Sequence, residues 1–304
     1  MAEITAKMVM ELREKTGAAM MLCKEALKET NADFEEATVW IRKKMGGKAA
    51  GATDRVAGEG IVAIVVADSR DAAIVELNSE TDFVARSEDF KALAKELAEH
   101  VLTNKSENVD HALTQPSQIQ EGFLLQDRVN DVYSKLREKM VFKRFDVMQS
   151  DENGVVAGYV HVPANDKIGV LVELGAKTPE DAKSEGMQNL ARELAMQIAA
   201  TKPKYQSREE VPEKTLAQER DIARSTALSE GKPEAAVEKI VEGRVRKFYE
   251  EAVLLDQAWL REQKKSVSQV LTEHGATLRR FVRYNVGEEV KGVETSGGIK
   301  ESAE

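Results

Sequence analysis

The sequence lacks the residues and segments that several classes of protein require. Its single cysteine, Cys23, excludes an internal disulfide framework. It contains no apolar span of 18 residues and no apolar signal region, so we expect a soluble cytoplasmic protein that does not enter a membrane. The charge balance is 44 − 53 = −9, and lysine and arginine form no long block. Direct binding of DNA or RNA is therefore disfavoured.

Motifs of the common catalytic and cofactor sites are also missing. No Gly-rich loop ends in Lys-Ser or Lys-Thr, so we do not expect tight nucleotide binding by this chain alone. The four histidines, His100, His111, His161 and His274, are scattered, and none lies at metal-ligand spacing from another ligand. No Gly-x-Ser-x-Gly elbow occurs, and Cys23 is more simply a small core residue than a nucleophile. We predict no cofactor, no metal and no enzyme chemistry.

The sequence does contain two copies of one strand-turn-helix unit. An apolar run ends at Glu76-Leu77 and another at Glu173-Leu174, an offset of 173 − 76 = 97. Upstream, Gly60 and Gly154 open matching hairpins at an offset of 154 − 60 = 94, so the second turn is three residues longer. Apolar residues at helical spacing follow each run: Phe90, Leu93, Leu97 and Val101 in the first copy and Met187, Leu190, Leu194 and Ile198 in the second.

The copies differ in the loop between strand and helix. Thr81-Asp82-Phe83-Val84 in the first copy stands opposite Thr178-Pro179-Glu180-Asp181 in the second. Because the same scaffold tolerates a wholly polar loop, it does not require Phe83 and Val84, and we predict that this loop contacts another molecule. The alternative is that Phe83 folds back and caps the core of its own domain.

Two stretches of the sequence resemble a known family. Residues 76–86 (ELNSETDFVAR) and residues 12–27 (LREKTGAAMMLCKEAL) are similar to two signatures of bacterial elongation factor Ts, the guanine-nucleotide exchange factor for elongation factor Tu. The resemblance covers nearly the whole chain in the family's domain order. Ala19 and Leu22 depart from it, since Gly and Asp are expected there, and this departure concerns the docking geometry rather than the assignment.

Pattern and resemblance together predict an α+β protein with several parts. The resemblance implies a ubiquitin-associated-like bundle of three helices that docks on elongation factor Tu. Long charged helices separated by Gly231 and Pro233 predict a protruding antiparallel coiled-coil hairpin. The Gly-rich stretch after the bundle is typical of a flexible linker. The predicted bounds are 1–45 for the bundle, 46–58 for the linker, 59–140 and 141–202 for the two core subdomains, 203–265 for the helical hairpin, and 266–304 for a carboxy-terminal module that returns to the core and ends in a frayed tail.

Four further residues match family contact positions. Met20, Met21 and Lys24 are expected to dock on elongation factor Tu. Adjacent methionines cannot both face one core, so we expect one of them to be an exposed anchor. The alternative is that both are partly buried core filler. His161, in the second hairpin, matches a position that meets the partner away from its nucleotide pocket, and an ordinary exposed histidine is the alternative.

The helical hairpin has two readings. The resemblance implies a role in partner contact or in dimer formation, including a homodimer or a two-plus-two complex with elongation factor Tu through the core and the coiled-coil arm. A purely structural hairpin is the alternative, because its apolar stripe is wide enough only to pair the two helices.

The resemblance implies catalysis of GDP release without bond chemistry. Phe83 would wedge between helices of elongation factor Tu near the magnesium and phosphate site, and Asp82 would disturb the polar network there, so that GTP rebinds during polypeptide elongation. Two other classes remain open. An interaction scaffold would leave nucleotide release unchanged, and a hydrolase built on Asp82 and His161 would require those side chains to converge.

Overall fold

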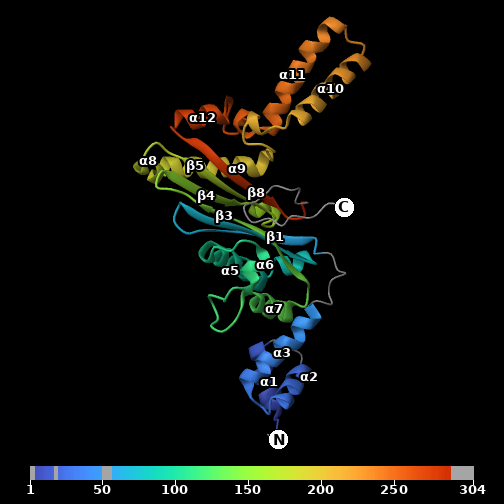
Figure 1. Ribbon diagram of the computed structural model, residues 1–304, viewed down its shortest axis with the longest axis vertical. Coiled ribbons are helices and arrows are strands. Elements are labelled where there is room, and N and C mark those ends of the chain that lie inside the picture. Colours follow the sequence, from blue (N-terminus) through green and yellow to red (C-terminus); the bar gives the residue numbers. More distant parts are fainter. Residues whose placement is uncertain (1–3, 17–19, 50–56, 289–304) are drawn as a thin grey trace.

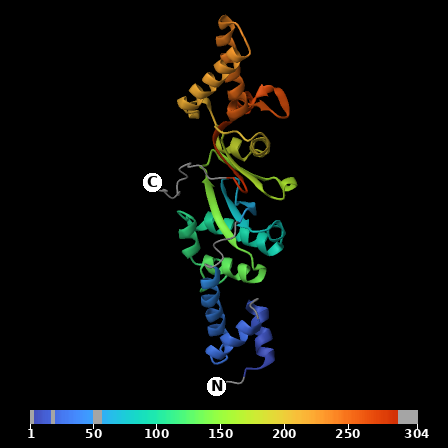
Figure 2. The ribbon, with the colours of Figure 1, turned by 90° about the vertical axis from the view of Figure 1, so that its right-hand side faces the viewer.

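Four parts follow one another along an elongated molecule (Figure 1). The structure is a computed structural model that describes residues 4–16, 20–49 and 57–288. A helical bundle lies at one end, two sheet-containing subdomains stack in the middle, and a helical hairpin projects at the other end, which a second view also shows (Figure 2). None of the helices within these residues is both long and apolar enough to cross a membrane. The α+β class is confirmed.

The amino-terminal bundle consists of α1 (Ala6–Thr16), α2 (Met20–Glu29) and α3 (Phe34–Ala49). Its core includes Leu12, Cys23 and Leu27. Asp33 caps α3, because its Oδ1 accepts hydrogen bonds from the backbone N–H groups of the two following glutamates at 2.9 and 2.8 Å.

The linker prediction is wrong at its start. Helix α3 continues to Ala49, four residues into the range assigned to the linker. Each of Gly46 and Gly47 lowers helix stability by about 1 kcal/mol relative to alanine. The helix tolerates this cost because its other end is packed in the bundle. Residues 50–56 of the predicted linker lie outside the described residues.

The first subdomain is a three-stranded antiparallel sheet covered by helices. The strands β1 (Glu59–Val66), β2 (Asp71–Ser79) and β3 (Met140–Gln149) lie in the order β1-β2-β3. The predicted boundary at residue 140 is wrong, since β3 pairs with β2 and not with the second copy. The helices of this subdomain are α4 (Asp82–Ala85), α5 (Glu88–Asn104), α6 (Val109–Thr114) and α7 (Leu125–Leu136), and α5 packs against all three strands.

The second subdomain repeats this order. The strands β4 (Gly154–Val160), β5 (Ile168–Gly175) and β8 (Thr277–Asn285) form an antiparallel sheet in the order β4-β5-β8. Helices α8 (Pro179–Lys183) and α9 (Glu185–Thr201) follow β5, as α4 and α5 follow β2. Pairing of β8 with β5 confirms the prediction that the last strand returns to the sheet of the second copy.

The hairpin helices are α10 (Glu213–Ser229) and α11 (Glu234–Ala252), which pair through Ala223, Ala227, Val237 and Val241. Gly231 in the connection has φ = +72°, the left-handed region that glycine adopts freely. The predicted end of the arm at residue 265 is wrong, because α11 ends at Ala252. The chain then turns back because the apolar side chains of Leu254 and Trp259 are buried in the second core. Strands β6 (Ala258–Trp259) and β7 (Glu262–Ser266) and helix α12 (Val267–Glu273) complete that region.

The two sheets pack against each other through a shared core that includes Val62, Ile74, Leu171 and Tyr284. A carbonyl in each hairpin turn also accepts a hydrogen bond from the other sheet. The N–H of Val62 donates to the carbonyl of Asp166 at 2.7 Å, and the N–H of Val156 donates to the carbonyl of Ser69 at 2.6 Å. These four residues occupy equivalent positions of the two copies, so the contact between copies is itself repeated.

Candidate functional site: an exposed phenylalanine on a fixed turn

The segment predicted to be a loop is a single helical turn, α4. Thr81 is its N-cap, and the Thr81 Oγ1 accepts a hydrogen bond from the N–H of Val84 at 3.4 Å. Phe83 is 84% exposed, whereas Val84 is 8% exposed and packs in the first core. The alternative in which Phe83 caps its own core is therefore wrong. Val84 anchors the turn from inside and presents almost no surface to another molecule.

The turn is held from the connection between α7 and β3. The carboxylate of Glu138 accepts hydrogen bonds from the Thr81 N–H at 3.0 Å and from the Thr81 hydroxyl at 2.8 Å. The carboxylate of Glu80 accepts from the N–H of Lys139 at 2.7 Å. Sequence reasoning missed Glu138 because it lies 57 residues from Thr81 and nothing in the local pattern marks it. These bonds fix the backbone that presents Phe83.

Asp82 lies beside Phe83 and forms an exposed ion pair with Arg86 at 2.8 Å, one helical turn later. The two side chains are 41% and 56% exposed, and such pairs contribute only about 0.3–0.5 kcal/mol. Either group can therefore exchange its partner at low cost. A large apolar side chain flanked by two weakly paired charges is suited to insertion into a polar surface.

The predicted docking residues of the bundle lie on the outside of α2. Met20 is 46% exposed, Met21 is 76% exposed, and Lys24 is exposed. The opposite side of α2 supplies the buried residues of the bundle core. The alternative in which both methionines fill the core is wrong, and two methionines, rather than the one expected, are available as adaptable anchors.

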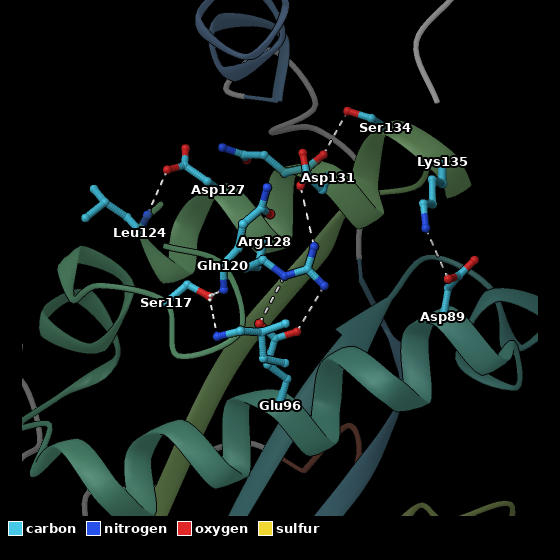
Figure 3. A network of polar contacts seen from close by, with 12 residues as sticks. Asp89, Glu96, Ser117, Gln120, Leu124, Asp127, Arg128, Asp131, Ser134 and Lys135 are labelled. Carbon is cyan, nitrogen blue, oxygen red and sulfur yellow. Dashed lines mark hydrogen bonds and ion pairs between the residues drawn. The ribbon is translucent and has the colours of Figure 1, made fainter. Parts of the chain in front are cut away.

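The bundle is attached to the subdomain that carries Phe83. Helix α3 contacts α7, and Arg128 of α7 holds Glu96 of α5 through two hydrogen bonds at 3.1 and 3.2 Å (Figure 3). Lys135 of α7 also reaches Asp89 of α5 at 3.4 Å. Burial works to lower the pKa of Arg128, but its bonds to Glu96 outweigh burial and raise the pKa. The charged pair thus fastens α7, and with it the bundle, to α5.

His161 lies in the second hairpin and is half-buried. Its Nδ1 lies 2.7 Å from the hydroxyl of Tyr159, and the adjacent Val162 is 69% exposed. The following turn meets the first copy, because the carboxylate of Asp166 also lies 3.6 Å from Nζ of Lys91 on α5. His161 is therefore presented from a turn that rests on the subdomain of Phe83.

Nothing in this geometry favours the hydrolase alternative. The carboxylate of Asp82 is bonded to Arg86, and the ring of His161 is bonded to Tyr159. Within residues 4–16, 20–49 and 57–288, no group of three or more His, Cys, Asp or Glu side chains is arranged to hold a metal ion.

A family model described as elongation factor Ts matches residues 80–288, which is more than half of the chain. The chain belongs to the elongation factor Ts family. The family acts in translation elongation, exchanging the guanine nucleotide of elongation factor Tu, and is not a catalyst of bond chemistry. The match begins in the Phe83 segment and covers the rest of the first subdomain, the second subdomain and the hairpin. The bundle and the strands β1 and β2 lie outside it.

The chain contains a further repeat that the sequence reasoning missed. Lys143-Arg144 on β3 and Arg279-Arg280 on β8 are at an offset of 280 − 144 = 136. Arg144 Nε lies 2.6 Å from a carboxylate oxygen of Glu76, and Arg280 Nε lies 3.0 Å from one of Glu173. The pattern of an apolar residue, two basic residues and a phenylalanine in FKRF and LRRF could have revealed the third strand of each copy.

Proposed function

We propose that this chain accelerates GDP release from elongation factor Tu by inserting Phe83 near the magnesium and phosphate site of that GTPase. The observation that supports this most is the 84% exposure of Phe83 on a turn whose backbone is held by Glu138. When a partner covers a phenylalanine that is so exposed, burial of its apolar surface contributes favourably to the free energy of binding. Asp82 then exchanges Arg86 for polar groups around the magnesium ion.

The magnitudes require more than one contact. Raising the rate of GDP release about a thousandfold requires about 4 kcal/mol, whereas burying one phenylalanine contributes about 1.5–3 kcal/mol. Docking contacts supply the remainder in this proposal, through Met20, Met21 and Lys24 on the bundle and through His161 on the second hairpin. Thermodynamic linkage then requires reciprocity. If this chain weakens the affinity of elongation factor Tu for GDP, bound GDP weakens the affinity of elongation factor Tu for this chain to the same extent.

Stopped-flow release of a fluorescent GDP analogue from elongation factor Tu tests the proposal. We expect strong acceleration by the unmodified chain and an acceleration about ten- to a hundredfold smaller for Phe83→Ala, because each 1.36 kcal/mol changes a rate tenfold. Ile119→Ala is the matched control, since Ile119 is also an exposed apolar residue, at 62%, but lies in a different loop. That variant should keep the full rate.

Binding to nucleotide-free elongation factor Tu separates a wedge from a plain anchor. A wedge predicts that Phe83→Ala slows release more than it weakens this binding. Equal losses in both would contradict the wedge. No acceleration by the unmodified chain would contradict the function itself.

A homodimer or a two-plus-two complex stays a separate prediction, which light scattering of the chain alone and with its partner tests.

A further inference from the structure

A groove lies where the helical hairpin joins the second subdomain, between the end of α9 and the facing sides of α10 and α11. Its volume is about 440 Å³, and we call it the arm groove. Sites that hold ligands are commonly about 300–1,000 Å³ in volume. The residues that matter for its chemistry are Lys202, Lys204, Glu219, Ile222, Arg244 and Phe248.

The arm groove is basic although the chain is acidic overall. Lys202, Lys204 and Arg244 have no ion-pair partner among the described residues, while Lys247 is paired with Glu251 at 3.5 Å. Glu219 is the one lining carboxylate in the described structure without such a pair, so the local balance is 3 − 1 = +2. The whole chain has a net charge of −9. Charges gathered within about one Debye length of 8 Å attract an acidic partner.

The groove also presents apolar surface. Ile222 is 59% exposed, and the neighbouring Phe248 is half-buried. Pairing of the two helices does not use Ile222, because the hairpin core consists of Ala223, Ala227, Val237 and Val241 with Ile240 and Val245 beside it. A β-branched apolar side chain exposed among unpaired cations contributes nothing to the arm itself.

We propose that the arm groove binds an acidic amphipathic segment of a protein partner, with apolar side chains on Ile222 and Phe248 and carboxylates on Lys202, Lys204 and Arg244. A protein segment fits better than single-stranded nucleic acid, whose bases require exposed aromatic faces for stacking. Phe248 is the one aromatic residue among the described residues that line the groove, and it packs partly against the small cluster at the base of the arm, so only part of its ring is exposed. This binding is independent of GDP release.

Fluorescence anisotropy with the full chain tests the proposal. The probe is a labelled peptide of about three helical turns with leucines on one face and glutamates on the other. A second peptide has glutamine in place of each glutamate. We expect the acidic peptide to bind about tenfold or more tightly than its glutamine counterpart, and to weaken as salt rises from about 50 to 200 mM.

Charge reversal locates the site. The double substitution Lys204→Glu and Arg244→Glu should weaken binding of the acidic peptide about tenfold. Lys239→Glu is the matched control, because Lys239 is an exposed lysine of α11 that does not line the groove, and it should leave binding unchanged. Both variants should accelerate GDP release as the unmodified chain does, so a failure here is distinguishable from a failure of the exchange function.

Several results would overturn the proposal. Equal binding of the acidic and glutamine peptides would exclude charge recognition, and equal weakening by the control substitution would exclude the arm groove. Tighter binding of single-stranded RNA at the same residues would assign the groove to nucleic acid. Tighter binding of a peptide comprising residues 289–304 than of the acidic probe would assign it to the chain's own tail.

Discussion

The two sheet-containing subdomains solve the same local problems with equivalent residues. Thr81 and Thr178 cap the short helix of each copy, and Ser87 and Ser184 cap the long helix that follows. Each sheet has a register shift at the same point of its central strand, after Glu76 and after Glu173. The offset of 97 residues found in the sequence therefore extends to hydrogen bonds and bulges.

The copies differ in one exposed side chain on a turn of similar backbone structure. Phe83 corresponds to Glu180, since 180 − 83 = 97, and both side chains are exposed on a capped turn. The second turn forms with no large apolar residue at that position, so the fold does not need Phe83. The scaffold therefore fixes where this side chain lies, whereas the type of side chain can vary without loss of the fold and can be selected for function.

The largest effect is expected from the buried carboxylates that join the central and third strands. The Glu76 side chain is fully buried and paired with Lys143 and Arg144, whose side chains are 28% and 18% exposed. Glu76→Gln leaves those cations without a counter-charge and should lower the free energy of unfolding by about 3 kcal/mol. Urea denaturation followed by circular dichroism measures the loss.

The equivalent Glu173→Gln should cost less, about 1.5 kcal/mol, because its partners Arg279 and Arg280 are 31% and 41% exposed. Burial works to raise the pKa of Glu173, but hydrogen bonds from Ser150 and the two arginines outweigh it and lower the pKa below 4.5. Its contribution is therefore present above about pH 4.5 and lost as the pH falls through the folded pKa. A loss for Glu173→Gln equal to that for Glu76→Gln would contradict this ranking.

Exchanging the two turn residues tests whether exposure alone suffices. Phe83→Glu gives the first copy the chemistry of the second and should reduce the acceleration of GDP release about ten- to a hundredfold. The free energy of unfolding, measured by thermal denaturation, should change by less than about 0.5 kcal/mol because the side chain is exposed.

The reciprocal Glu180→Phe places an exposed phenylalanine on the second turn and is the matched control. It should leave GDP release as in the unmodified chain, and in the double variant it should not restore the rate lost with Phe83→Glu. Restoration would show that either turn can act, and the site assignment would then be wrong.

The smallest effect concerns a buried polar position that differs between the copies. His100 on α5 is 1% exposed, and its Nε2 lies 2.9 Å from Oε1 of Gln115. The equivalent Gln197 on α9 is also buried and bonds the backbone near Trp259. Burial lowers the pKa of His100 below 6.5, against opposing effects of the Gln115 hydrogen bond and the Glu96 charge.

Below about pH 6.5 the unfolded chain therefore binds a proton that the folded chain does not, so stability should fall with decreasing pH there. Asn104 is bonded to Nδ1 of His100, and Ser106 and His111 contact Gln115, so these are further polar groups of this cluster. His100→Gln should flatten the slope of unfolding free energy with pH below about pH 6.5. An unchanged slope would show that His100 is not its cause.

Local periodicity predicted much of this architecture. The two long helices, the central strands, the helical hairpin and the return of the last strand are each visible as apolar spacing or turn chemistry. The third strand of the first sheet was assigned to the wrong copy, because strand pairing depends on residues far apart, such as Glu76 and Arg144. The length of the arm was overestimated because charged residues continue past the last helical turn.

The candidate site was predictable in identity and less so in geometry. Phe83 and Asp82 stand out because the two copies can be aligned within one chain. The burial of Val84 follows from the direction in which a single helical turn points its side chains, which spacing alone does not give. The support from Glu138 depends on tertiary structure.

The contact between the sheets pairs unlike residues at equivalent positions. A methyl group on Gly158 would lie 2.6 Å from Cγ2 of Ile64, its counterpart in the first copy. Two first copies facing each other would place isoleucine against isoleucine, and two second copies would place glycine against glycine and leave a void. The contact between unlike copies is therefore better packed than either contact between like copies, which disfavours pairing of two like subdomains from neighbouring molecules.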